Sequence, residues 1–184
     1  MLFPTLTFGI FFLIVYSVAW LLRGSNEWRK IVLLVASWIF YGWWDTRFVL
    51  LLILSGMLNW GAARLILAAD GRPRLRRAWL ALGIAANLSI LGFFKYYGFF
   101  MVQLEGLLHL AGWQRDLAIL QVVLPVGISF FTFQGMSYVI DIYRRQTAPA
   151  TLLDMTLLMS FFPHLVAGPI VRASHLVPQF ERVP

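Results

Sequence analysis

The chain is built from long uncharged, mostly apolar runs, and its charged residues gather in the short stretches between them. The first run, 1–22, would reach roughly 33 Å as a helix, which is enough to cross the hydrocarbon core of a bilayer. Further runs follow at 31–44, 48–63, 78–94, 117–140 and 155–171. This pattern predicts an all-α fold: a polytopic transmembrane helical bundle with five or six membrane segments and no second domain.

Two of these runs are too short or too interrupted to form ordinary spans. The run at 31–44 would measure only about 21 Å as a helix, so it predicts a span that is short, is extended at its ends, or is buried in a bundle or re-entrant. The run at 155–171 contains Pro163 and Pro169, so we expect a broken or re-entrant segment. Irregular backbone survives at membrane depth only where it is buried in protein or lines a cavity. Between the fourth and fifth runs, 96–116 is apolar but contains charged residues, and it predicts an interfacial helix followed by a loop.

Small and polar residues inside the runs indicate how the helices pack. Ala81, Ala85 and Ser89 recur every fourth residue, and this stripe predicts a close helix contact. Amide side chains are costly in lipid unless they find partners, so we expect them to make hydrogen bonds between helices. These amides are Asn59, Asn87, Gln121 and Gln134.

The composition agrees with a membrane protein and excludes several other classes. Apolar residues make up 60% of the 184 positions and charged residues only 12%, compared with about 25% in a soluble domain. Disordered chains need the opposite balance. Because cysteine is absent, disulfides, thiolate zinc sites and thiol nucleophiles are excluded. The histidines at 109, 164 and 175 lack metal-ligand spacing, so no metal site is expected.

The net charge of +7 is concentrated in alternate loops. The stretches 23–30, 70–77 and 144–145 carry +2, +3 and +2, whereas 45–47 and 95–116 each sum to zero. Basic loops of this kind stay in the cytoplasm, which predicts an external N-terminus. The same placement argues against a nucleic-acid partner, because the charges mark loops rather than one basic surface.

Three ionisable residues are candidates for lining a substrate path. His164 lies in the interrupted run, where a neutral imidazole either relays protons and orients an acyl group or is simply hydrogen-bonded. Arg172 ends the same run and either holds an anion or marks the membrane edge. Asp141 ends an apolar run and either pairs locally with Arg144 or Arg145 or contacts substrate.

Four stretches in series resemble the membrane-bound O-acyltransferase family. They are 33–44 (LLVASWIFYGWW), 90–97 (ILGFFKYY), 124–144 (from LPVGISFFTF to SYVIDIYR) and 160–172 (SFFPHLVAGPIVR). Their order and spacing also match. The similarity is greatest to the bacterial branch that acetylates exopolysaccharides such as alginate or cellulose, and a sister branch passes D-alanine to teichoic acid.

The resemblance implies a membrane tunnel that runs from a cytoplasmic acyl donor to an external hydroxyl. The donor would be an acyl-CoA or an acyl thioester carrier as co-substrate, with no bound cofactor. The acceptor would be a polysaccharide or a periplasmic acetyl-transfer protein, and the location a bacterial inner membrane. The resemblance covers the front part of the family fold, so residues 1–184 are expected to be the N-terminal part of an O-acyltransferase domain. The family's catalytic histidine is then expected beyond Pro184, and the fragment alone is expected to be inactive.

Other functions remain open at this point. D-alanyl transfer by the sister branch is the nearest enzymatic alternative. A transporter subunit would also use broken helices, although transporters often carry paired interruptions in two halves and none is found here. A non-catalytic membrane scaffold that docks an external partner is the third alternative.

Overall fold

A computed structural model describes residues 5–110, 123–165 and 171–182, which form helices and no strand. The elements are α1 (Leu6–Leu21), the 3₁₀ turn η1 (Leu22–Gly24), α2 (Asn26–Gly42), α3 (Thr46–Ala68), α4 (Pro73–Leu110), α5 (Ile128–Tyr143), α6 (Leu152–Ser160), α7 (Phe162–Leu165) and α8 (Ala173–Glu181). The predicted all-α fold is therefore confirmed.

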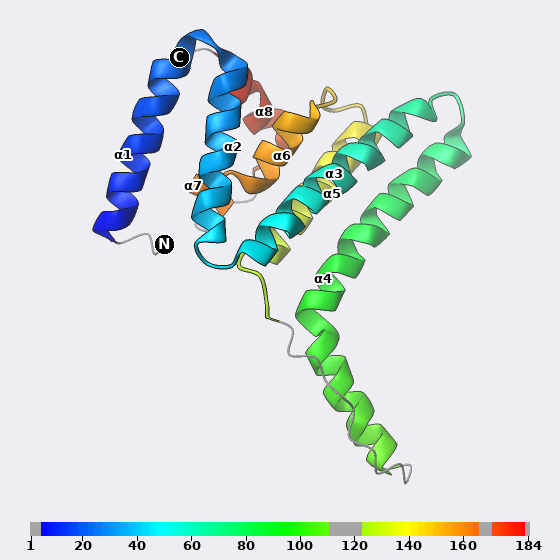
Figure 1. Cartoon of the computed structure of the whole chain (residues 1–184). Coiled ribbons are helices and arrows are strands. Elements are labelled where there is room, and N and C mark those ends of the chain that lie inside the picture. The colour runs from blue at the N-terminus through cyan, green and yellow to red at the C-terminus, as the bar shows by residue number, and fades with distance from the viewer. Residues whose placement is uncertain (1–4, 111–122, 166–170, 183–184) are drawn as a thin grey trace.

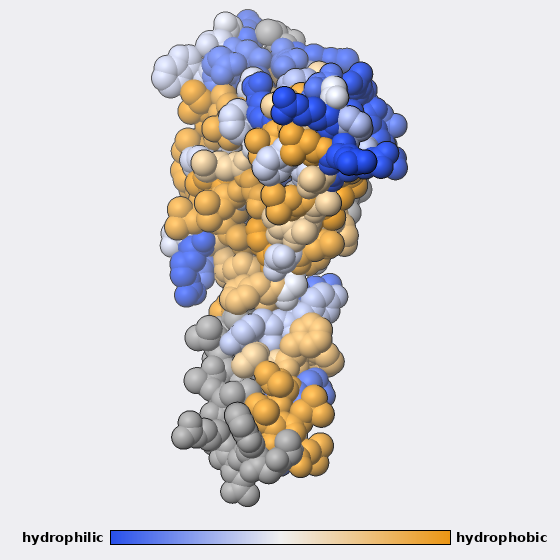
Figure 2. All heavy atoms as spheres, turned by 90° about the vertical axis from the view of Figure 1, so that its right-hand side faces the viewer, coloured by the Kyte–Doolittle hydropathy of each residue, from blue (hydrophilic) through white to orange (hydrophobic). Residues whose placement is uncertain are grey.

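The surface of the bundle fits a lipid environment. Within the described residues, three stretches are long and apolar enough to cross a membrane: Leu6–Gly24, Thr46–Ala68 and Pro73–Leu110. Figure 2 shows a broad apolar surface below one strongly polar end. Large apolar side chains such as Leu13, Leu50 and Leu54 are exposed on the bundle, as expected where lipid rather than water is the solvent.

The core forms around α3. This helix packs against α4, α5 and α6, so it lies in the centre of the bundle (Figure 1). Leu52 and Ile66 of α3, Val139 of α5 and Leu157 of α6 are fully buried at these contacts. By contrast, α1 lies at the periphery and packs mainly on α2, where its aromatic rings meet Phe40 and Phe162.

Close helix contacts use different small residues from those expected. Ala81, Ala85 and Ser89 are exposed, so the predicted stripe does not form a contact among the described helices. The buried face of α4 is offset by two residues and contains Gly83 and Asn87. Gly83 lies so close to Ala62 that an added Cβ would be only 3.1 Å from the alanine methyl.

The fourth run and the interfacial segment form one helix. Residues 73–110 are continuous in α4, whose 38 residues would measure about 57 Å, and its distal half extends beyond the rest of the bundle (Figure 1). The prediction of a separate interfacial helix and loop was wrong for 96–110, and 111–116 lies outside the described residues. The reason is that nothing in this stretch breaks a helix: it contains no proline, and isolated charges are tolerated on an exposed helix surface.

Residues 117–122 of the run at 117–140 lie outside the described structure, and within 123–140 the helix begins at Ile128. Gly127 precedes α5 with a left-handed φ of 77°, a conformation that glycine adopts without steric cost. Pro125 removes a backbone donor just before it, so residues 123–127 stay outside the helix. Neither hydropathy nor charge marked the C-terminal helix α8, and it was not predicted.

The basic stretches lie together at one end of the bundle (Figure 1). Arg145 forms an ion pair with Asp70 at 2.6 Å between Nη2 and Oδ1, which joins the end of α5 to the α3–α4 turn. Arg76 donates to the carbonyl of Tyr143 at 2.8 Å across the same junction. The three basic stretches therefore share one end of the structure, as the predicted topology requires.

Candidate functional site

The interrupted run is broken, as predicted. Helix α6 begins at the N-cap Thr151, whose hydroxyl accepts a hydrogen bond from the backbone N–H of Asp154, and it ends at Ser160. Phe161 leaves the helix with φ −56° and ψ 104°. Pro163 explains the break, because its ring would clash with the carbonyl of Met159 in a continuous helix. The short helix α7 follows, and residues 166–170 lie outside the described structure.

His164 of α7 lies inside the bundle, 8% exposed. Its Nε2 is 3.2 Å from Nε2 and 3.4 Å from Oε1 of Gln134, so one hydrogen bond forms whose direction depends on the imidazole tautomer. Phe130 and Phe161 pack against the ring at centroid distances of 5.5 and 5.6 Å. The other ring nitrogen, Nδ1, is buried and has no hydrogen-bond partner among the described residues.

Gln134 of α5 connects both sides of the broken segment. Its side chain is fully buried, and its amide nitrogen donates to the carbonyl of Val171 at 3.0 Å while the same amide group contacts His164. The chain thus returns to Gln134 immediately before α8. The expectation that Gln134 bonds to another segment is confirmed, and so is the one for Asn59 and Asn87, whose amides bond reciprocally at 2.9 and 3.3 Å.

The other candidates take different positions. Arg172 follows Val171 and is the N-cap residue of α8, with an exposed side chain. Asp141 is buried on α5, about two turns beyond Gln134. Arg145 pairs with Asp70 rather than with Asp141, and none of the described ion pairs joins Arg144 to Asp141. The structure therefore brings the Arg172 backbone next to the His164–Gln134 pair but gives Asp141 no described contact with it.

The buried His164–Gln134 pair beside the break at Phe161 limits the chemistry that this site can perform. A buried imidazole with an unsatisfied nitrogen can exchange a hydrogen bond or a proton with a group that enters the bundle. The described residues contain no cluster of three metal-ligating side chains. The sequence did not identify Gln134 as the partner of His164. It indicated only that an amide in an apolar run needs a hydrogen-bond partner.

Comparisons with known proteins show which proteins this chain is similar to. The chain is 40% identical over 183 residues to the probable alginate O-acetylase AlgI of Pseudomonas aeruginosa, an alignment that covers 98% of this chain and 35% of the relative. It is 36% identical to the protein of that name from Azotobacter vinelandii, again over 98% of this chain and 36% of the relative. The chain is a homologue of the alginate O-acetylases.

A relative with a different name is the peptidoglycan O-acetyltransferase of Helicobacter pylori, which is 35% identical over 83% of this chain and 32% of that protein. The chain therefore spans about a third of the length of the curated relatives it matches. No family model matches it, and no solved structure matches it with significance. The resemblance to the alginate O-acetylase branch is confirmed by these relatives.

Proposed function

We propose that this chain forms part of an integral membrane O-acetyltransferase that moves acetyl groups across the inner membrane to hydroxyls of a cell-envelope polysaccharide. The observation that carries the proposal is the similarity over 98% of the chain to alginate O-acetylases. The donor is an acyl-CoA or an acyl thioester carrier that approaches the basic, cytoplasmic end. The acceptor on the outer side is the glycan itself or a periplasmic protein that passes the acetyl group on.

The geometry supports a path through the bundle beside the broken segment. Backbone groups that lose their helical partners at Phe161 need a polar environment, and the buried His164–Gln134 pair provides one. In this proposal both residues line the acyl path, Arg172 stands at its edge, and Asp141 lies farther along α5. The histidine that performs the transfer is expected outside residues 1–184.

The acceptor class has two candidates. An alginate- or cellulose-like exopolysaccharide follows from the relatives named for alginate. Peptidoglycan is the second, because a relative carries that name at nearly the same identity. D-alanyl transfer and a purely scaffolding role have no such relative to support them here.

Deletion of the gene in its own host tests the proposal. Acetyl esters would be measured separately in the secreted polysaccharide and in purified peptidoglycan. We expect one of the two to lose its acetyl esters and to regain them on complementation with the whole gene. Unchanged acetyl content in both would contradict acetyl transfer, and lost D-alanine esters would assign the chain to the sister activity instead.

A chimaera tests whether these 184 residues carry a functional part. The matching third of the Pseudomonas aeruginosa O-acetylase would be replaced by this chain, and alginate acetylation would be measured in a strain that lacks its own enzyme. Acetylation by the chimaera is expected. A stably produced chimaera without activity would limit the similarity to the fold.

A further inference from the structure

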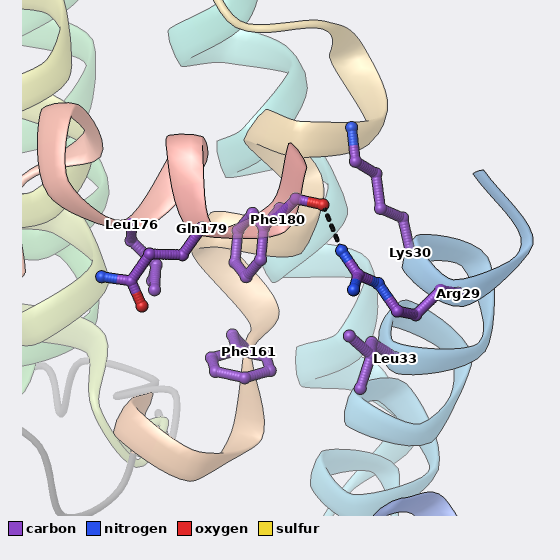
Figure 3. A pocket seen from close by; sticks show the side chains of 7 residues that line it. All are labelled: Arg29, Lys30, Leu33, Phe161, Leu176, Gln179 and Phe180. Carbon is purple, nitrogen blue, oxygen red and sulfur yellow. Dashed lines mark hydrogen bonds between the residues drawn. The ribbon is translucent and has the colours of Figure 1, made fainter. Parts of the chain in front are cut away.

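A pocket that shares Phe161 with the surroundings of His164 lies between the start of α2 and helix α8. Its volume is about 220 Å³, and it is lined by Arg29, Lys30, Leu33, Phe161, Leu176, Gln179 and Phe180. Figure 3 shows the Arg29 side chain reaching from α2 to the end of α8, with the rings of Phe161 and Phe180 on the same side of α2 as Leu33. The pocket thus has a cationic edge and apolar walls.

The cation at this edge has no anionic partner in the described structure. Arg29 is only 7% exposed, and the two N–H groups of its Nη2 are shared among three neutral oxygens: Asn26 Oδ1 at 2.6 Å and the carbonyls of Phe180 and Arg182, each at 2.7 Å. No carboxylate of the described residues lies within ion-pair distance of it. Buried charges are ordinarily paired, because an isolated one loses its hydration without compensation.

The neighbouring lysine differs in this respect. Lys30 Nζ is 2.7 Å from Asp154 Oδ1 and 3.8 Å from the exposed carboxylate of Glu27. The charge of Lys30 is therefore balanced within the protein, whereas that of Arg29 is met only by dipoles. The described hydrogen bonds of Arg29 use only Nη2 and not Nε or Nη1. A guanidinium with such donors beside a pocket is suited to a phosphate, which it can bind with two parallel hydrogen bonds.

The rest of the pocket suits an apolar chain at the depth of lipid headgroups. Leu33, Phe161, Leu176 and Phe180 present carbon surface, and Gln179 is the one neutral polar side chain in the lining. Arg29 lies at the end of the bundle where the basic stretches gather, and basic residues there face the anionic cytoplasmic leaflet. An anionic head and an apolar tail are therefore required of the same ligand.

We propose that this pocket binds an anionic phospholipid of the cytoplasmic leaflet, with its phosphate on the Arg29 guanidinium and the first part of an acyl chain against Phe161 and Phe180. The lipid joins α2 to α8 and supplies the missing counter-charge. Phosphatidylglycerol is favoured over phosphatidylethanolamine, because the ammonium group of the latter cancels the charge that Arg29 selects. The inference does not rest on the proposed function, since it uses the pocket, its charges and the predicted cytoplasmic position of the basic end.

Native mass spectrometry of the intact protein in detergent tests the proposal, with phosphatidylglycerol and phosphatidylethanolamine titrated separately. Arg29→Gln and Leu176→Trp are each expected to weaken phosphatidylglycerol binding by about tenfold or more, as expected for loss of one charge-assisted hydrogen bond or of the pocket space. Arg74→Gln, which removes an exposed arginine of the same end, is the matched control and should bind like the wild type.

Because Arg29 also holds the end of α8, the Leu176→Trp variant decides the matter if Arg29→Gln fails to fold. Unchanged lipid binding by folded Leu176→Trp would overturn the proposal, and so would equal affinity for the two lipids. Binding of glycerol phosphate alone to the wild type, at the same concentration as the lipid, and its loss in Arg29→Gln would show a headgroup-sized anion site and not a lipid site. Displacement of the lipid by stoichiometric acetyl-CoA would assign the pocket to the acyl donor instead.

Discussion

Lys30 of α2 and Asp154 of α6 form an ion pair with 2.7 Å between Nζ and Oδ1, and both side chains are almost completely buried. Thr151 holds the other carboxylate oxygen of Asp154 at 2.7 Å, so the first turn of α6 is fixed relative to α2. Since α6 leads directly to the break at Phe161, this pair fixes where the broken segment enters the bundle.

Asp154→Asn is expected to destabilise the protein strongly. The substitution leaves Lys30 as a buried charge with only the distant Glu27 carboxylate, and removing one partner of a buried pair costs about 3–5 kcal/mol. The measurement is the Tm of the purified protein in detergent. Asp70→Asn breaks the exposed pair with Arg145 and serves as the control, with an expected loss of at most about 1 kcal/mol. Equal Tm changes in the two variants would contradict the burial argument.

Gly135→Ala is expected to destabilise the junction of α3 and α5. A methyl at Gly135 would overlap the amide of Asn59, which cannot easily move because it donates to the Ser55 carbonyl at 2.8 Å and bonds reciprocally with Asn87. Overpacking of this kind costs about 1–3 kcal/mol.

The control for this prediction is Gly92→Ala in α4. No atom lies within 4 Å of the position that its Cβ would occupy, so the substitution should be neutral or stabilise the helix by about 0.5–1 kcal/mol. Thermal unfolding of both variants in the same detergent provides the comparison. A more stable Gly135→Ala would show that Asn59 has room to rotate away.

The turn between α3 and α4 is expected to face the cytoplasm. Residues 1–184 contain no cysteine, so Thr46→Cys at the start of α3 and Arg74→Cys in the first turn of α4 each introduce a single reporter within this part of the protein. A membrane-impermeant maleimide added to intact cells should label Thr46→Cys and spare Arg74→Cys until the cells are permeabilised. The reverse pattern would invert the topology, and with it the side assigned to the acyl donor.

His164→Ala, Gln134→Leu and Arg172→Ala are expected to lower acyl transfer by the whole protein. Gln134→Leu removes the donor to Val171 and the partner of His164 while nearly keeping the side-chain volume. Misplacement of His164 in the acyl path is expected to lower the rate roughly tenfold to a hundredfold. Acetyl esters per amount of membrane-inserted protein are the readout. His175→Ala, an exposed histidine of α8, should leave the acetyl content unchanged.

Normal acetylation in all three variants would return these residues to a structural role. In that case, a lower Tm for His164→Ala and Gln134→Leu without loss of activity would show that the pair only closes the broken segment. Loss of activity in Arg172→Ala alone would place the path at the edge of the bundle rather than beside His164.

Hydropathy and the distribution of charge determined the outline of this protein. The membrane bundle, the break at Pro163 and the shared end of the basic stretches all follow from local causes: transfer into lipid, the missing N–H of proline and the cost of moving arginine across a bilayer. The same causes explain why Asn59, Asn87 and Gln134 were expected to find partners, since an amide in lipid has no water to bond.

Local patterns failed where a charge is balanced by a distant segment. The uncharged run begins only after Lys30, and the extension of α2 back to Asn26 places that lysine within the helix, where Asp154 from far along the chain lets it lie buried. Likewise, α8 is amphipathic and short, and Arg29 holds its end. Neither contact leaves a trace in the sequence near either residue.

The amino-acid sequence alone therefore determined the apolar helical bundle, the common end of its basic stretches and the position of the break. Only the tertiary structure decided what surrounds His164 and what faces Arg29, because both environments are assembled from helices that are remote in sequence. Hydrogen bonds and counter-charges act over a few ångströms, and the positions of such partners depend on how the helices pack.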